Sequence, residues 1–180
     1  MRVASVLPAF LAITMLACGM MTSARANDEP MSAEDFVDTA SAMNQGEINA
    51  AESAMEQDDA SAAVKEFAQQ LHRDHRALED ALQGLAEARQ LDLSALPDVR
   101  SMGNATRLVL LRGETYDREF LEAQVAAHER FIEHMERAGR ELEDDELREF
   151  ANSRLPELRE HLNHAKKLLA SVSENADPGE

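Results

Sequence analysis

Four ionisable side chains interrupt apolar stripes that would otherwise be continuous, and all four are of types that bind metals. They are Glu47, His75, His128 and His161, each near the middle of its own helical stretch. One carboxylate and three imidazoles suit zinc, iron, copper or manganese. Because a charged or unpaired group is unfavourable in a dry core, these residues should partner one another or a bound ion. The pattern therefore predicts a transition-metal site without identifying the metal.

A second interpretation requires no metal. The same four residues could form a buried hydrogen-bond network in a structural or interaction module, since buried polar groups are normally hydrogen-bonded. In each predicted hairpin the two inward residues differ in position along the bundle axis by about one helical turn, roughly 6–8 Å. This offset leaves both interpretations open. His72 and Glu157 share the relevant faces and are reserve ligands.

An oxygen-using di-metal enzyme is a third interpretation. Ferritin-like enzymes of that kind carry Glu-x-x-His pairs on two helices. Here the residues three positions before His75 and His161 are His72 and Leu158. The chain also lacks a Gly-rich phosphate loop and a Gly-x-Ser-x-Gly nucleophile motif. The sequence therefore favours a binding role over catalysis.

The elements that would position these residues follow from the helical periodicity. Helices are predicted over residues 32–57, 60–90, 114–140 and 145–173. Short polar turns separate the first pair and the second pair, whereas residues 91–113 form a long connection. We therefore expect an all-α, ferritin-like four-helix bundle in which a long crossover joins two antiparallel hairpins.

Two local features qualify this bundle. The apolar residues 108–111 are expected to form a small helix across its end, and Pro156 should kink the fourth helix or mark its restart.

The composition restricts the class of protein and of partner. The chain has 180 residues with 18 Lys and Arg against 35 Asp and Glu, which gives a formal net charge of −17. Such an acid excess argues against nucleic acid as a partner, because phosphate binding needs clustered basic residues. Seven Gly, five Pro and few aromatic residues argue against a β-sandwich or barrel. One helical domain is expected.

Residues 1–26 resemble a secretory signal peptide. Arg2 precedes an uncharged apolar run over residues 3–17, and a small-x-small site follows at Ala24-Arg25-Ala26. We expect cleavage after Ala26 and a location in the periplasm or envelope, with no membrane span in the mature form. An uncleaved anchor is the weaker alternative, because the apolar run is barely of spanning length.

The predicted cleavage also assigns the rest of the chain. Cys18, the single cysteine, would leave with the signal, and the residues before it match a lipoprotein site poorly. The bundle domain is predicted over residues 27–172, and residues 173–180 are predicted to be a disordered tail.

Several motifs in order resemble an exported bacterial family known as domain of unknown function 4142. Residues 64–75, VKEFAQQLHRDH, are similar to its "VK-x-FA-x-x-M-x-x-DH" stretch, and residues 113–120 to its "G-x-x-FD-x-x-F" stretch, with Asp117 retained. Glu47 matches its acidic residue, and Gly46 keeps part of the Gly pair before it. Residues 124–128 and 155–162 resemble its last two signatures. The resemblance implies a ferritin-like bundle in the envelope and no established activity.

Overall fold

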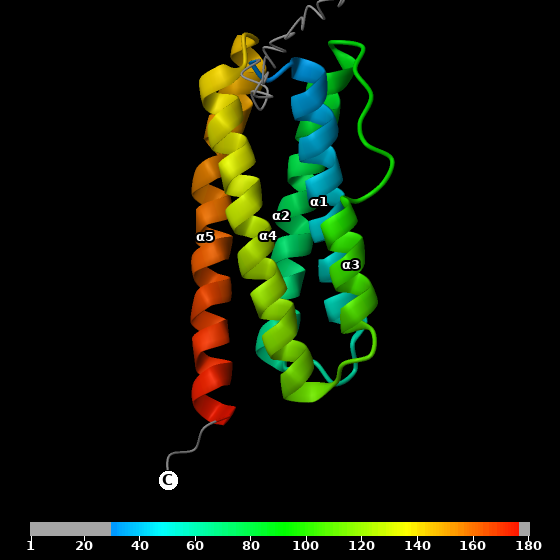
Figure 1. Cartoon of the computed structure of the whole chain (residues 1–180), viewed down its shortest axis with the longest axis vertical. Coiled ribbons are helices and arrows are strands. Elements are labelled where there is room, and N and C mark those ends of the chain that lie inside the picture. Colours follow the sequence, from blue (N-terminus) through cyan, green and yellow to red (C-terminus); the bar gives the residue numbers. More distant parts are fainter. Residues whose placement is uncertain (1–29, 177–180) are drawn as a thin grey trace, which may run out of the picture.

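The computed structural model describes residues 30–176 as an all-α bundle (Figure 1). Its helices are α1 (Ala33–Glu56), α2 (Ala62–Glu87), α3 (Val99–Leu108), α4 (Gly113–Glu141) and α5 (Asp145–Ala176). The long helices pair as α1 with α2 and α4 with α5, and the two pairs pack on each other. The prediction of an all-α helical bundle is confirmed; the ferritin-like assignment stays a prediction.

The helix boundaries follow from local capping. The Ser32 hydroxyl accepts the Asp35 N–H at 3.0 Å, and the Ser61 hydroxyl accepts the Val64 N–H at 3.3 Å. Side-chain acceptors of this kind satisfy N–H groups that the first turn of a helix leaves free. The Asp117 carboxylate accepts the Ser61 backbone N–H and so fastens the start of α2 to α4. This gives the retained motif residue Asp117 a structural role.

The small helix of the crossover lies elsewhere than the sequence predicted. It is α3, which begins after Asp98, whose carboxylate accepts the N–H groups of Arg100 and Ser101. Residues 109–112 form the turn that follows, with Leu110 82% exposed. Rather than crossing the end of the bundle, α3 lies along α1 and α4 (Figure 1). The strong cap at Asp98 outweighed the apolar run as a helix signal.

Gly46 allows α3 to approach α1 this closely. A Cβ atom at this position would lie 2.6 Å from the Ser101 Cβ, which is closer than carbon atoms pack. The Asp98 N–H also donates to the Ala42 carbonyl at 3.1 Å, which ties the crossover to α1 beside the glycine. The close packing of α3 on α1 therefore explains why the motif has a glycine at this position.

The core consists of two apolar clusters with a polar layer between them. One cluster holds Phe36 to Ala40 of α1, Leu78 to Ala86 of α2, Phe131 to Ala138 of α4 and Leu147 to Leu158 of α5. The other cluster holds the buried apolar residues of α1 from Ala51 on, of α2 up to Leu71 and of α4 up to Leu121, together with Ala165 of α5. The gap left on each helix holds a buried polar side chain: Asn44, Glu47, His75, Gln124, His128 and His161. The helices therefore bring their polar residues to one level.

The ends of the bundle differ slightly from the predicted boundaries. The helix α5 contains Pro156 and continues to Ala176, so residues 173–176, predicted as part of the tail, are helical. Residues 173–177 contain neither Gly nor Pro, so no helix breaker occurs there before Pro178. The predicted signal peptide, its cleavage site and Cys18 lie outside the described residues. Over residues 30–176, no helix combines the length and apolar character that a membrane span requires.

Candidate metal centre

Three of the four predicted ligands meet at the centre of the polar layer. His75, His128 and His161 come from α2, α4 and α5, and each is at most 1% exposed. The three ring centroids are 5.4, 5.5 and 5.5 Å apart, an almost equilateral triangle. One nitrogen of each ring lies within 4.8 Å of a nitrogen of both others. The residue types and their spacing suit a single metal ion.

His128 has its outer nitrogen fixed by its own helix. Its Nδ1 lies 3.0 Å from the Gln124 backbone carbonyl, which can only accept, so Nδ1 carries the proton. The inner nitrogen, Nε2, therefore carries no proton and has a free lone pair.

His75 is fixed in the same tautomer by Asn44. Its Nδ1 lies 2.7 Å from the Asn44 Oδ1. The orientation of that amide is fixed because its Nδ2 donates to the His75 carbonyl at 2.9 Å and to Glu79 Oε2 at 2.7 Å, both acceptors. The Asn44 Oδ1 must therefore accept from His75 Nδ1–H. The His75 Nε2 is then unprotonated and has a free lone pair.

A further layer holds Asn44 in place. The buried Glu79 carboxylate accepts from the Ser41 hydroxyl at 2.7 Å and from the Gln45 amide at 2.9 Å, in addition to Asn44. Three donors from α1 thus stabilise one carboxylate of α2. Outer partners of this kind orient the metal-ligating imidazoles of known sites.

His161 completes the arrangement through a carboxylate. Its Nε2 donates to Asp74 Oδ2 at 3.0 Å, while its Nδ1 is buried without a partner. A carboxylate behind an imidazole raises the basicity of the ligand nitrogen in metal sites. The free ligand atom of His161 is therefore Nδ1.

The consequence is that the Nε2 lone pairs of His75 and His128 face each other, in the same buried group as the unpartnered Nδ1 of His161. His75 Nε2 and His128 Nε2 are 3.4 Å apart, and neither has a proton to share with the other. Two ligands about 2.0–2.1 Å from a tetrahedral zinc ion are roughly 3.3 Å apart. A cation between the rings would turn mutual repulsion into coordination. Three protein ligands would also leave a fourth position open, as in catalytic zinc sites.

Burial keeps the rings of His75 and His128 neutral and ready to coordinate. Desolvation, with the neighbouring His128 and His161, holds the pKa of His75 well below its usual value. Desolvation first, then His161, lowers the pKa of His128 to about 3, although its bond to Gln124 opposes the shift. Neutral imidazole is the form that binds metal, so no proton has to leave near neutral pH.

Glu47, the fourth predicted ligand, lies beside this group and not within it. Its Oε2 is 3.9 Å from Nδ1 of His128, the side of the ring that faces away from the other histidines. The two are not an ion pair near pH 7. The His128 Nδ1–H already donates to Gln124, and desolvation raises the pKa of Glu47 to about 8. The reason for its position is that Glu47 lies one turn along α1 from Asn44 and faces α3 and α4.

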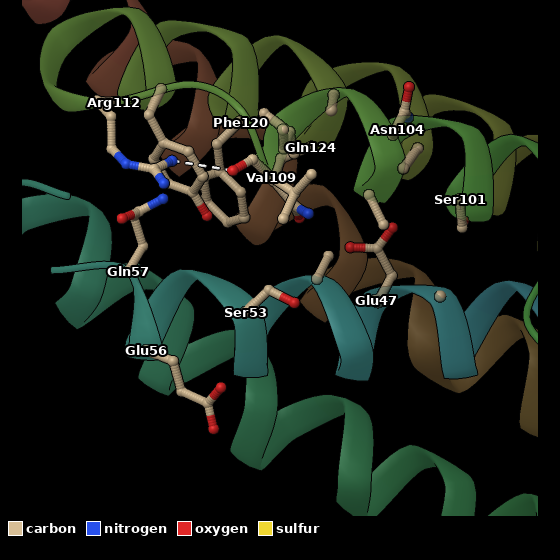
Figure 2. Close-up of a pocket in the computed structure, with 17 residues that line it drawn as sticks. Glu47, Ser53, Glu56, Gln57, Ser101, Asn104, Val109, Arg112, Phe120 and Gln124 are labelled. Carbon is tan, nitrogen blue, oxygen red and sulfur yellow. Dashed lines mark hydrogen bonds between the residues drawn. The ribbon is translucent and has the colours of Figure 1, made fainter. Parts of the chain in front are cut away.

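Glu47 instead lines a cavity of about 320 Å³ between α1, α3 and α4. In Figure 2 its side chain rises from α1 toward α3, while Gln57 and Arg112 lie toward the other end of the view. The Oε2 of Glu47 and the Oε1 of Gln124 have no hydrogen-bond partner. The polar layer thus serves two sites that meet at His128.

The reserve ligands lie outside the centre, and the sequence missed the residues behind it. His72 Nε2 contacts Glu52 at 3.1 Å at the surface, and Glu157 is not among the clustered ligands. Neither Asn44 nor Asp74 was predicted as a partner. The available signal was the i, i+3, i+4 spacing of Ser41, Asn44 and Gln45, a polar face on α1.

Comparison with known proteins places the chain in a family. The model of the family described as "Domain of unknown function (DUF4142)" matches residues 19–168. The chain therefore belongs to that family. No curated protein and no solved structure matches it. The function has to be argued from the site itself.

Proposed function

We propose that this member of the family is an exported metal-binding protein whose ion is held by His75, His128 and His161. The observation that carries the proposal is the convergence of three imidazole nitrogens whose rings are each fixed through the other nitrogen. A first-row transition metal suits three imidazoles, with zinc as the reference ion.

The tautomers favour a metal over a purely structural hydrogen-bond network. A network would need a proton between His75 Nε2 and His128 Nε2. Moving the His75 proton inward would leave its Nδ1 facing the Asn44 oxygen, two acceptors 2.7 Å apart. Turning the Asn44 amide to repair this would point its oxygen at the His75 carbonyl and the Glu79 carboxylate. A bound cation avoids every one of these repulsions.

The proposed location is the periplasm or envelope, and it rests on residues 1–26. A basic start, an apolar run and the small-x-small site before Asn27 support export with cleavage after Ala26. N-terminal sequencing of the protein from the periplasmic fraction tests this, with Asn27 expected as the first residue. An intact N-terminus in the cytoplasm would contradict it.

Metal content is the decisive measurement for the site. The chain from Asn27, without a His tag, should hold about one equivalent of transition metal, because three imidazoles form one site. His128→Ala and His161→Gln should each lose it. His72→Ala is the matched control, because it removes an imidazole from the same helix as His75 but outside the centre.

The thermal stability gives an independent result. Metal at about 100 times its dissociation constant stabilises a protein by about 2.7 kcal/mol. For a domain of this size that corresponds to roughly 5–10 °C in melting temperature, which chelator should abolish. Equal, sub-stoichiometric metal in wild type and His128→Ala, with a melting temperature unaffected by chelator, would support the structural network instead.

A further inference from the structure

We propose that the cavity beneath α3 binds a small apolar molecule that ends in a single primary amine. This inference does not depend on the metal proposal, because the cavity lies on the other side of His128. It starts from the shape of the cavity, whose volume of about 320 Å³ falls within the range of small-molecule pockets. Its walls are largely apolar: Ala50, Ala105, Leu108, Val109, Phe120 and Ala127.

One end of the cavity carries polar groups that the protein does not satisfy. Glu47 and Gln124 are only 4% and 2% exposed. The Glu47 Oε2 and the Gln124 Oε1 nevertheless lack a partner. Leaving a buried acceptor without a donor is unfavourable. Two such atoms, on two residues that line the same cavity, indicate a missing donor.

The chemistry of the missing donor follows from the two atoms. Both are oxygen acceptors when Glu47 is ionised, so a carboxylate or phosphate would satisfy neither. A hydroxyl has one donor hydrogen, whereas a primary ammonium has three and no acceptor. An ammonium group can therefore serve both oxygens and favour the ionised form of Glu47, which burial disfavours. The apolar walls require that the remainder of the molecule be hydrocarbon-like.

The other end of the cavity argues for a single amine. Arg112 lines that end, and its guanidinium donates to the Val109 carbonyl at 2.9 Å (Figure 2) and to the Leu111 carbonyl at 2.6 Å. A second ammonium group at that end would meet the guanidinium, with which Asp59 already pairs at 3.7 Å. Glu56 also lines the cavity, but its side chain points away from the other labelled side chains in Figure 2. A monoamine avoids this repulsion, and its apolar tail would end beside the aliphatic part of Arg112.

The test is calorimetric titration with four six-carbon probes: hexylamine, 1-hexanol, hexanoate and 1,6-diaminohexane. Hexylamine should bind at least about tenfold more tightly than the other three, which is 1.4 kcal/mol. Binding of hexylamine and hexanol with equal affinity would reduce the site to an apolar slot and overturn the proposal. No binding of hexylamine would also overturn it.

Two variants assign the binding to this cavity. Glu47→Gln turns an acceptor into a donor that opposes the amine, so hexylamine affinity should fall at least about tenfold. Ala50→Leu should block every probe by filling the cavity, and circular dichroism confirms that both variants fold. Glu52→Gln is the matched control, because it makes the same change on α1 at a residue that faces His72 and Arg76 instead. Equal hexylamine affinity in wild type and Glu47→Gln would contradict the proposal.

Discussion

The histidine centre and the cavity beneath α3 lie on opposite sides of the His128 ring, yet the two sites treat polar atoms differently. In the centre, each imidazole uses one nitrogen to bind a protein partner and turns the other inward. In the cavity, the Oε2 of Glu47 and the Oε1 of Gln124 have no hydrogen-bond partner. A surrounding layer of hydrogen bonds orients the imidazoles of the centre, whereas the cavity has hydrogen-bond acceptors that no protein donor satisfies.

This difference suggests how each site discriminates among ligands. Fixed tautomers select a cation with directional ligand preferences, and they depend on residues such as Asn44 that never touch it. Bare acceptors beside an apolar wall select a donor on a hydrocarbon body. The three predictions below test this contrast, in order of decreasing effect on stability.

Asn44→Leu should give the largest effect, because it breaks the support of the centre while keeping the side-chain volume similar. It removes the acceptor of His75 Nδ1–H and a donor to Glu79, both buried. We expect a loss of about 2–4 kcal/mol in unfolding free energy, with loss of metal binding. Urea denaturation measures the first and metal content the second.

The exposed Asn49 on the same helix provides the control for that change. Asn49→Leu should stay within about 0.5 kcal/mol of wild type, as surface substitutions usually do. Equal stability of the two variants would mean that the layer behind His75 does not hold the centre.

Glu47→Gln should act in the opposite direction. The substitution replaces a buried carboxyl group, whose ionised form burial disfavours, with a neutral amide of similar shape. A gain of roughly 1 kcal/mol in unfolding free energy is expected near pH 7, with unchanged metal content. Loss of metal in this variant would place Glu47 among the ligands after all and would break the contrast between the two sites.

Asp144→Asn sharpens the contrast with a carboxylate that is fully partnered. The Asp144 carboxylate accepts from Arg89 at 2.7 Å through both oxygens, and it also accepts the N–H groups of Glu146 and Leu147. Arg89 first, then these N–H groups, lowers the pKa of Asp144 to about 2.

The sign of the pH dependence follows from that lowered pKa. The Asp144 carboxylate stabilises the fold above its ordinary pKa of 3.8, and the contribution is lost as the pH falls toward 2. Because the pair is partly exposed, the contribution is at most about 1 kcal/mol. The difference between wild type and Asp144→Asn should therefore be present at neutral pH and shrink below pH 4, as measured by denaturation. A difference that grows in acid would contradict this.

Much of the fold was predictable because periodicity and capping act locally. The four long helices came from apolar spacing, whereas α3 was misplaced because the cap at Asp98 is a one-residue signal. For the histidines, the sequence could predict only that each lies on the buried face of its helix, and not that the three rings meet. The predicted one-turn offset of His128 and His161 is reconciled by side-chain direction: in antiparallel helices each side chain leans toward its own N-terminus, so these two lean together.

The rest of the site depended on tertiary contacts. Which way Glu47 faces is decided by α3, whose packing on Gly46 no periodicity reports. The partnership of Asp74 with His161 joins residues 87 positions apart in the chain. The tautomers, and with them the case for a metal, follow from such contacts.

The position of α3 in the crossover has an evolutionary consequence. The helix α3, which forms the roof of the cavity, belongs to a connecting segment. Connections tolerate changes in length and sequence far better than packed helices do. The three histidines, by contrast, lie on helices that cross both halves of the core. Relatives could therefore diversify what enters beneath the roof while inheriting the same three imidazoles.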